Sequence, residues 1–405
     1  MKCWKYLTVL VLCLFFVGCG TGSQAVSTIA ESPPVERIRG PRLLELDIKN
    51  GGEVVALEEN RIYYTDKAAE TEDYYCYDMA TRETKKVGWQ LRQIFSGAGV
   101  TDRVVVGDAL YFYDYGDGCH FFYQLDFQKN SLTTERIDSF GSDGSCLVRV
   151  GDKLLIGKRE KRERKEGGFY FREFIEEIDP CTGEGKKLVE YASTYCYQRE
   201  KKTLYRSGEM LYGFTAAQDK LYVWVNKFVD RETTLYRTEG ELHPYLFIYD
   251  LDGELQEICP LPEPEGESYD SAGYLEVMGD YIFLSGSMTD GILLEKGPDE
   301  LRKIPMPETE ERVQRISLVR GPVQHDTPYL FYKYHGKQLY WFDHSKGSFH
   351  QLSLELPGEG VAIETILRGK DGGLLLELQK EESNKVQYYY INLNDFPEES
   401  FQAGK

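Results

Sequence analysis

The sequence lacks the short motifs that mark the common catalytic and nucleotide-binding sites. It contains no G-x-S-x-G, H-E-x-x-H, Walker or G-x-G-x-x-G element, and no two cysteines have the C-x-x-C spacing. Asp and Glu, in contrast, are too numerous for a paired-carboxylate site to be selected without geometry. The sequence therefore predicts no catalytic residue, no cofactor-binding residue and no metal ligand, and it leaves enzyme activity an open question.

Basic residues are scarce relative to acidic ones. The chain has 48 Lys and Arg against 67 Asp and Glu, which gives a formal net charge of −19. An acidic surface repels phosphate backbones, so we expect no nucleic-acid partner, and teichoic-acid-like polymers are disfavoured for the same reason. The charge is explained by solubility or, alternatively, by attraction of cations or of a basic partner.

Long apolar runs are missing except near the first residue. Tyr6 to Val17 is an apolar run of 12 residues behind Lys2 and Lys5, too short to span a bilayer but typical of a secretory signal. Phe16-Val17-Gly18-Cys19 stands where a lipobox would, so the segment resembles a bacterial lipoprotein signal. The resemblance implies cleavage before Cys19 and a lipid on its sulfur, which anchors the protein in the cell membrane on the extracytoplasmic side. The alternatives are an uncleaved anchor or an ordinary signal with a coincidental cysteine.

The segment after the signal is small and polar. Gly20 to Pro34 reads GTGSQAVSTIAESPP, which cannot bury a core and predicts a flexible tether. We therefore expect four regions, namely a signal peptide over residues 1–18, a tether over 19–40, a folded domain over 41–396 and a tail over 397–405.

The folded part repeats one pattern, in which a short apolar strand, a tight turn and a strand of alternating aromatic and aliphatic residues follow one another. The clearest copy is Val104 to Asp114, with similar copies at residues 54–66, 147–157 and 275–286. Repeats of this period indicate small sheets that bury their faces against each other, and the 30 Tyr and 20 Phe favour strands. A second signal is an apolar strand that ends in Asp and then turns, at Asp78, Asp126, Asp179, Asp250 and Asp343.

These signals divide the chain into seven units. We place them at residues 52–88, 98–137, 144–190, 209–258, 273–304, 313–354 and 361–394. Their second strands are predicted to start near Arg61, Ala109, Lys153, Lys220, Tyr281, Tyr329 and Gly373. Tyr191 to Gly208 is an insertion, either a loop or an extra hairpin.

The two ends of the repeat array complement each other. The seventh unit has only three strands, whereas Arg42 to Ile48 is a strand without a unit. Pairing this N-terminal strand with Lys385 to Leu393 completes the last unit and protects its edge. The sequence thus predicts an all-β fold, a seven-bladed β-propeller of four-stranded antiparallel blades closed by the N-terminal strand. Six or eight blades are the alternatives, because the first and fifth units are weakly marked.

Two stretches resemble a known repeat. Leu339-Tyr340-Trp341-Phe342-Asp343, followed by Gly347, resembles the YWTD-like class of β-propeller repeats, as does Ile62-Tyr63-Tyr64-Thr65-Asp66. The chain also resembles uncharacterised propeller lipoproteins of Gram-positive bacteria. The resemblance implies a motif that packs blades and carries no chemistry. Because the YWTD-like class has six blades, the resemblance supports six as an alternative blade number.

The cysteine and histidine patterns leave alternatives open. After removal of the signal and lipidation of Cys19, six cysteines either form disulfides or stay as free or buried thiols: Cys76, Cys119, Cys146, Cys181, Cys196 and Cys259. The six histidines either bind a metal or lie on exposed loops, and their spacing favours loops: His120, His243, His325, His335, His344 and His350.

Three further patterns have both an ordinary and a functional interpretation. Asp114 to Gly118 and Asp250 to Glu254 partly resemble calcium loops, but hairpin turns explain them better. Lys158 to Lys165, KREKRERK, either grips an anionic partner or is a solvated hairpin tip, and we favour the tip. The aromatic runs either stack on sugar rings or bury every other ring on a strand, which we favour: Tyr74-Tyr75, Phe121-Phe122 and Tyr388-Tyr389-Tyr390.

The predicted function follows from the fold and the anchor. We expect a monomeric, lipid-anchored extracytoplasmic β-propeller that acts as a binding or scaffolding module for a protein or glycan at the cell envelope. The alternative is a propeller enzyme, a hydrolase or lyase that acts on envelope or extracellular glycan, and a sensory or transport-accessory subunit is a third hypothesis. Carboxylates, His or Tyr that converge at the channel mouth favour the enzyme, whereas a shallow aromatic or acidic face favours binding.

Overall fold

The structure of this protein is a computed structural model. It describes residues 42–49, 52–67, 71–91, 103–106, 109–116, 119–137, 147–151, 153–163, 168–179, 184–198, 203–233, 238–262, 273–286, 291–297, 300–307, 316–319, 329–334, 336–344, 346–352, 354, 356–358, 360–369, 371–380 and 386–395. Within these ranges, no helix is long and apolar enough to cross a membrane.

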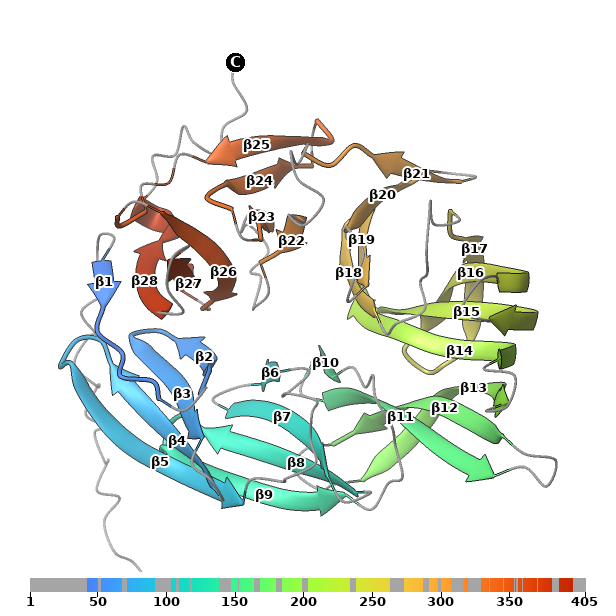
Figure 1. Ribbon diagram of the computed structural model, residues 1–405, viewed down its shortest axis with the longest axis horizontal. Helices are drawn as coiled ribbons and strands as arrows, with labels where there is room; N and C mark the ends of the chain where they lie inside the picture. The colour runs from blue at the N-terminus through green and yellow to red at the C-terminus, as the bar shows by residue number, and fades with distance from the viewer. Residues whose placement is uncertain are drawn as a thin grey trace, which may run out of the picture. The chain divides into compact units, whose positions relative to one another are not determined.

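Nearly all regular structure in the described residues is β-strand, arranged in five four-stranded antiparallel sheets and one eight-stranded antiparallel sheet (Figure 1). The first sheet contains β2 (Val54–Glu58), β3 (Arg61–Lys67), β4 (Thr71–Asp78) and β5 (Glu83–Leu91). The second contains β6 (Arg103–Val106), β7 (Ala109–Gly116), β8 (Cys119–Asp126) and β9 (Ser131–Ile137). The eight-stranded sheet contains β10 (Leu147–Val150), β11 (Lys153–Glu163), β12 (Phe169–Ile178), β13 (Gly185–Gln198), β14 (Thr203–Ala217), β15 (Lys220–Thr233), β16 (Thr238–Asp250) and β17 (Leu255–Pro260).

Three sheets follow in chain order. The first of these contains β18 (Gly273–Met278), β19 (Tyr281–Gly286), β20 (Ile292–Lys296) and β21 (Leu301–Ile304). The next contains β22 (Ile316–Leu318), β23 (Tyr329–Lys333), β24 (Leu339–Asp343) and β25 (Ser348–Leu352). The last sheet contains β26 (Val361–Arg368), β27 (Gly373–Lys380), β28 (Val386–Asn392) and, from the other end of the chain, β1 (Arg42–Leu44). A single 3-10 turn, η1 (Leu393–Asp395), is the helical element among the described residues.

The second strand of each predicted unit begins at the predicted residue. β3, β7, β11, β15, β19, β23 and β27 start at Arg61, Ala109, Lys153, Lys220, Tyr281, Tyr329 and Gly373. The reason is local, because tight turns precede these strands, as at Gly279, whose φ of 65° suits glycine. The predicted Asp turn also forms at Asp78, whose carboxylate accepts hydrogen bonds from the N–H groups of Ala80 and Thr81 at 2.8 and 3.0 Å.

The eight-stranded sheet arises from the insertion at Tyr191 to Gly208. Over its described residues, this segment forms the ends of β13 and β14, which pair from Ser193 opposite Gly208 to Gln198 opposite Thr203. Of the two expectations for the insertion, the extra hairpin is therefore confirmed. The fold has six sheets if β10–β17 counts as one and seven if it counts as two sets of four, so the blade number stays a prediction.

The N-terminal strand closes the last sheet, as predicted. β1 pairs antiparallel with β28, with Arg42 opposite Tyr390 and Leu44 opposite Tyr388. The strand is shorter than the predicted Arg42 to Ile48 because the chain leaves the sheet after Leu44. It then turns toward the first sheet, where the N–H of Lys49 donates a hydrogen bond to the Asp66 carboxylate at 2.8 Å.

Clusters of buried side chains join each sheet to its neighbours. Tyr63 and Leu125 belong to the cluster between the first and second sheets, and Leu57 and Leu375 belong to the cluster between the first and last sheets. Other clusters join β6–β9 to β10–β12, the two halves of the eight-stranded sheet to each other, and each later sheet to the next. Because this order returns to its starting point, the chain is an all-β propeller whose core lies between the sheets.

Each sheet has two different ends. At the end that we call the turn end, the first strand turns into the second and the third into the fourth; at the opposite end, the hairpin end, the second turns into the third. β1 begins at the turn end, since Arg42 donates a hydrogen bond to the carbonyl of Met79, in the β4–β5 turn, at 3.0 Å. The hydroxyl of Tyr281 likewise bonds the His344 carbonyl of the next sheet at 3.3 Å. The chain therefore enters the propeller at the turn end.

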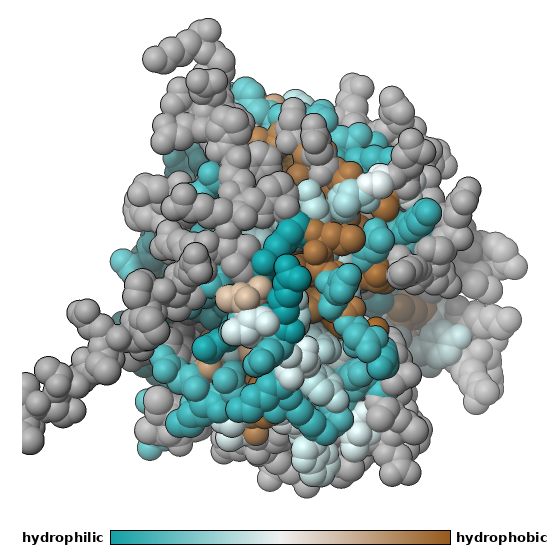
Figure 2. Space-filling model, turned by 90° about the vertical axis from the view of Figure 1, so that its left-hand side faces the viewer, coloured by the Kyte–Doolittle hydropathy of each residue, from teal (hydrophilic) through white to brown (hydrophobic). Residues whose placement is uncertain are grey.

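The side of the molecule on which β1 lies is shown in Figure 2. Hydrophobic residues form a band on this side, bordered by hydrophilic ones (Figure 2). On β1 itself, Leu43 is 49% exposed whereas Leu44 is 7% exposed. Adjacent residues of the closing strand thus face solvent and core, as the alternation of a strand requires.

Leu44→Ala should destabilise the protein by about 2–4 kcal/mol, because it removes a buried side chain that packs between the last and first sheets. Leu43→Ala, on the same strand but exposed, is the matched control and should change stability by no more than about 0.5 kcal/mol. Urea unfolding of the full chain in detergent, followed by tryptophan fluorescence, measures both. An equal loss of unfolding free energy in the two variants would contradict the role of β1 in closing the last sheet.

Candidate binding site

The longest described strands all belong to the eight-stranded sheet. β11 to β16 have 10–15 residues each, and every other described strand has nine or fewer. Their surplus length lies at the hairpin end, where the three pairs β11–β12, β13–β14 and β15–β16 are drawn as long ribbons (Figure 1). We call this surplus the hairpin sheet, which comprises residues 158–163, 168–173, 191–198, 203–208, 227–233 and 238–242.

The prediction of a solvated hairpin tip is wrong for Lys158 and Arg159 at the start of the basic run, whereas Arg162 is 65% exposed and residues 164–165 lie outside the described residues. Residues 158–163 continue β11, and the side chains of Lys158 and Arg159 are only 12% and 18% exposed. They form ion pairs with Glu176 and Glu173 on β12. The sequence hides this pairing because the acidic partners stand on the neighbouring strand.

Glu173 links the two halves of the eight-stranded sheet. Its side chain is 3% exposed, pairs with Arg159, and accepts a hydrogen bond from the N–H of Leu211 on β14 at 2.7 Å. The β14–β15 register shifts between Leu211 and Gly213, which turns this N–H away from the ladder. Burial raises the pKa of Glu173, while Arg159 and the Leu211 N–H act to lower it.

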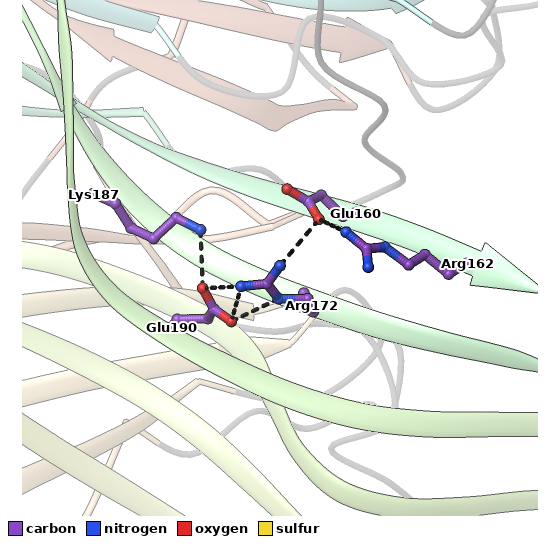
Figure 3. A network of polar contacts seen from close by, with 5 residues as sticks. All are labelled: Glu160, Arg162, Arg172, Lys187 and Glu190. Atoms are coloured by element: carbon purple, nitrogen blue, oxygen red, sulfur yellow. Dashed lines mark hydrogen bonds and ion pairs between the residues drawn. The ribbon is translucent and has the colours of Figure 1, made fainter.

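The opposite face of the hairpin sheet carries a network of charges (Figure 3). Arg172 forms a fork with Glu190, with Nε and Nη2 at 2.7 and 2.8 Å from its two oxygens, and Lys187 contacts the same carboxylate at 2.9 Å. Lys187 and Arg172 lower the pKa of Glu190. Arg162 and Glu160 extend the network at 3.4 Å. The network contains three positive and two negative groups, and exposed pairs of this kind stabilise by no more than about 1 kcal/mol each.

The face that carries Glu173 brings two arginines together between aromatic rings. On three adjacent strands, Tyr195 of β13 stands opposite Arg206 of β14, which stands opposite Arg231 of β15. Directly opposed residues share one face of a sheet. The guanidinium carbon of Arg206 lies 6.0 Å from the ring centroid of Tyr195 and 5.4 Å from that of Phe228. Arg206 therefore lies between two aromatic rings, one from each neighbouring strand.

A second row of the same face holds Ser193, Gly208 and Phe228, which oppose each other on the same three strands. Gly208, in the middle, has a φ of 99° that favours glycine, and it marks a register shift next to Arg206. A Cβ atom there would come within 2.5 Å of the Ala192 carbonyl oxygen, so the backbone of β13 leaves no room for a side chain in the centre of the row. We call the residues of the two rows the arginine site: Ser193, Tyr195, Arg206, Gly208, Phe228 and Arg231.

A second irregular backbone position lies beside Arg231. The β15–β16 register shifts here, and Asp230 has a φ of 44°, a strained conformation for a residue with a side chain. Gly240 packs against this bulge, since a Cβ atom there would come within 2.6 Å of the Asp230 carbonyl oxygen. Bulges re-aim side chains and are enriched next to functional sites. The extra residue lies on β15, so this one bulge accounts for the register shifts toward both β14 and β16 beside Arg231.

Two polar groups of the arginine site are buried without a hydrogen-bond partner in the described part of the chain. They are the hydroxyl of Ser193, a residue 3% exposed, and Nε of Arg231. Leaving such a group unsatisfied costs about 1–3 kcal/mol. In addition, Arg206 and Arg231 place like charges directly opposite each other, which destabilises a sheet. The site gathers positive charge and hydrogen-bond donors on one face.

A second polar cluster lies on three successive sheets. Glu276 is on β18, Tyr329 begins β23 and Arg368 ends β26. Burial raises the pKa of Tyr329, which the Glu276 charge raises further and Arg368 lowers, so the three groups are within electrostatic reach. Burial lowers the pKa of Arg368, a residue 3% exposed, to about 10. Because β18 and β26 are first strands, which line the centre of a propeller, this cluster corresponds to the channel position considered for an enzyme.

The histidines lie apart from any metal site in the described ranges, where no group of three or more metal-ligating residues occurs. His344 is an exposed turn residue, as predicted. His243 and His350 are on strands β16 and β25, so the loop prediction is wrong for both; His243 contacts Glu241 at 2.7 Å and His350 stacks on Trp341 at 5.0 Å. The side chain of His120 and residues His325 and His335 lie outside the described residues.

The described cysteines are free thiols, in line with the favoured alternative. Cys76 and Cys259 are buried and Cys196 is half-buried. Burial raises the pKa of the Cys259 thiol to about 11, which makes it a poor nucleophile. The side chain of Cys119 and residues Cys19, Cys146 and Cys181 lie outside the described residues.

The calcium-like segment Asp250 to Glu254 is a hairpin turn, as favoured from the sequence. The Asp250 carboxylate accepts hydrogen bonds from the N–H groups of Asp252 and Glu254 at 3.1 and 2.9 Å. The first residues of Asp114 to Gly118 belong to β7, and residues 117–118 lie outside the described ranges.

The aromatic runs serve packing where the structure describes them. Tyr74 is buried and Tyr75 is half-buried, as alternation predicts. Tyr388 to Tyr390 are all buried, so alternation is wrong there, because neighbouring sheets cover both faces of β28. The side chains of Phe121 and Phe122 lie outside the described residues.

Sequence reasoning missed every residue of the arginine site. Arg206 and Arg231 are 25 positions apart, and only the register of the strands brings them together. Gly208 and Gly240 interrupt strand-like stretches, and isolated glycines of this kind signal bulges.

The similarity of this chain to known proteins is limited to weak matches with solved structures. No family model matches this chain, and no curated protein matches it. Among solved structures, it is similar to the Dos1 propeller, with 11% identity and a TM-score of 0.45 over 82% of this chain and 75% of that chain. An oligogalacturonate lyase in complex with manganese has 14% identity and a TM-score of 0.41 over 85% and 88% of the two chains. An uncharacterized protein of Listeria monocytogenes EGD-e has 9% identity and a TM-score of 0.41 over 84% and 97%. With values this low, the similarities say nothing about ligand or activity.

Glu173→Ala should destabilise the protein by about 2–4 kcal/mol, because it leaves Arg159 and the Leu211 N–H without their buried partner. Since burial raises the pKa of Glu173 above 4.5, the folded chain binds a proton at this group more tightly than the unfolded chain does, and the stability that this group contributes falls as pH rises through the raised pKa. The loss should therefore be larger near pH 4.5 than at neutral pH. Glu190→Ala, in the exposed network, is the control and should cost no more than about 1 kcal/mol. Urea unfolding at both pH values checks this, and equal losses for the two variants would refute it.

Proposed function

We propose that this protein is a lipid-anchored extracytoplasmic β-propeller that binds a protein or glycan of the cell envelope through its hairpin sheet. The observation that carries the proposal is the concentration of surplus strand length in β11 to β16, at the hairpin end of one sheet. Loops and extensions that rigid scaffolds present are the usual carriers of binding function. The chain acts as a monomer and has no nucleic-acid partner in this proposal.

The direction of the strands supports a binding role for the hairpin end. Arg42 begins β1 at the turn end, and the hairpin sheet lies at the other end of its own strands. A partner on the hairpin sheet therefore does not compete with the point at which the chain enters the fold. The hairpin sheet also exposes apolar side chains, with Tyr197 at 52% and Val229 at 40%. Exposed tyrosine near arginine is typical of the centres of protein interfaces.

The anchor in this proposal is a lipid on Cys19. It rests on the lipobox-like segment Phe16 to Cys19 behind a short apolar run. Acyl chains partition into a membrane with about 0.8 kcal/mol per buried CH₂, so the modification would hold the propeller at the membrane surface.

An enzyme is the second candidate, and the cluster of Glu276, Tyr329 and Arg368 favours it. A half-buried tyrosine with a carboxylate and a guanidinium within electrostatic reach offers groups for proton transfer and for stabilising negative charge. Cleavage of an envelope glycan that is abolished by Tyr329→Phe would support this candidate over a binding module.

Tyr197→Asp should weaken partner capture at least about tenfold, which corresponds to the loss of one interface anchor. Leu255→Asp is the matched control, because Leu255 is 48% exposed on β17 of the same sheet but lies at the turn end. Pull-down from envelope extract and a glycan array measure capture by the wild type and both variants. Equal capture by the wild type and Tyr197→Asp, or loss in both variants, would contradict a binding role for the hairpin sheet.

Cys19→Ala should release the protein from the membrane fraction of a bacterial host. Mass spectrometry of the wild type should find an acylated cysteine at the new N-terminus, since the thiol is the attachment point. Cys13→Ala, inside the apolar run, is the control and should leave acylation intact. A wild-type protein that begins upstream of Cys19 or carries no acyl group would overturn the anchor.

A further inference from the structure

We infer that the arginine site binds the carboxylate of an acidic side chain on a protein partner. This inference rests on the proposed function, because it names the ligand class of the hairpin sheet. Its first support is charge. Arg206 and Arg231 oppose each other on one face, and a carboxylate between them turns a like-charge repulsion into two attractions. Guanidinium groups match the planar geometry of a carboxylate better than ammonium groups do.

The second support is the set of buried donors. Within the described residues, the Ser193 hydroxyl and Arg231 Nε have no hydrogen-bond partner. They belong to the two adjacent rows of the arginine site and lie on the same face. Gly208 stands in the middle of these rows, so β14 places no side chain between Ser193 and Phe228. A carboxylate has two oxygens with about four acceptor positions, enough to accept hydrogen bonds from Arg231 and Arg206, which stand opposite each other on adjacent strands.

The backbone supplies a third, independent support. A strained backbone conformation persists only where surrounding contacts hold it in place, and such conformations are enriched at ligand-binding sites. Here one bulge of β15, at Asp230, shifts the register toward both neighbouring strands beside Arg231, and Gly240 packs against it. This bulge acts on the direction in which Arg231 leaves its strand.

The ring contacts favour a protein carboxylate over a sugar acid. A uronic acid needs an open aromatic face on which its ring can stack. Tyr195 and Phe228 are already in contact with the Arg206 guanidinium, and Phe228 is 2% exposed. The net charge of −19 also disfavours a densely charged polymer, whereas a single acidic side chain approaches the site with little repulsion. Tyr197, two residues along β13 from Tyr195, offers an exposed ring on the same face to the residue beside the carboxylate.

The test uses the full chain in detergent and a fluorescein-labelled peptide of alternating glutamate and alanine. Its glutamine counterpart is the neutral probe, and labelled oligogalacturonate is the sugar-acid probe. Fluorescence anisotropy should show binding of the glutamate peptide that weakens with salt and is at least about tenfold tighter than that of the other two probes. Arg231→Met should abolish this preference, and Arg231→Lys should retain part of it.

Arg162→Met is the matched control, since Arg162 is 65% exposed on the opposite face of the hairpin sheet, and it should bind like the wild type. Arg231→Met should also keep or raise the thermal midpoint, because it removes a like-charge contact; a fall together with unchanged peptide binding would make Arg231 a structural residue and overturn the inference. If oligogalacturonate binds more tightly than the glutamate peptide, the inference that the ligand is a protein is wrong. If the neutral peptide binds as tightly as the glutamate peptide, the inference that the ligand is a carboxylate is wrong.

The two levels of the proposal fail in different ways. If Arg231→Met binds the glutamate peptide like the wild type while Tyr197→Asp still loses envelope capture, the carboxylate site is wrong and the binding role of the hairpin sheet stands. If Tyr197→Asp captures partners normally, the proposed function itself is wrong.

Discussion

No sheet of this propeller can bury its own faces, and the whole fold depends on this constraint. Each face is covered by the preceding or following sheet, so the packing order has to return to its start. β28 shows the result, since Tyr389 packs toward β22–β25 while Tyr388 and Tyr390 pack toward the first sheet. Three consecutive rings are buried on one strand, which is incompatible with a sheet that has one solvated face. The pairing of β1 with β28 is the condition for this closure.

Features with a local cause could be predicted from the sequence. Tight turns determine where second strands begin, and they do begin at residues such as Arg61 and Gly373. The closing strand could also be predicted, because a three-stranded last unit and an unassigned strand at Arg42 complement each other. The blade number could not, because β13 pairs with β14 and so joins two predicted units into one sheet. Whether a connection pairs or loops depends on register, which composition does not encode.

The candidate site could not be predicted for the same reason. Arg159 meets Glu173, and Arg206 meets Arg231, only through the register of neighbouring strands. A slip of one residue would turn each of these side chains to the other face. A bulge of β15 further changes which residues face each other, and its signal in the sequence is no more than the isolated glycines Gly208 and Gly240 on the two neighbouring strands. Charge counting therefore treats Lys158 and Arg159 as solvated, whereas they are held against acidic side chains of β12.

The position of β1 has a mechanical consequence. Arg42 is the first described residue of the strand that closes the ring, and in the described part of the chain three residue pairs hold that strand to β28. Tension applied to the chain from its N-terminal side is transmitted to this short ladder before it reaches any other strand. In a propeller held from its N-terminal side, a pulling force would therefore first separate β1 from β28. The sheets from β2 onward would keep their own hydrogen bonds.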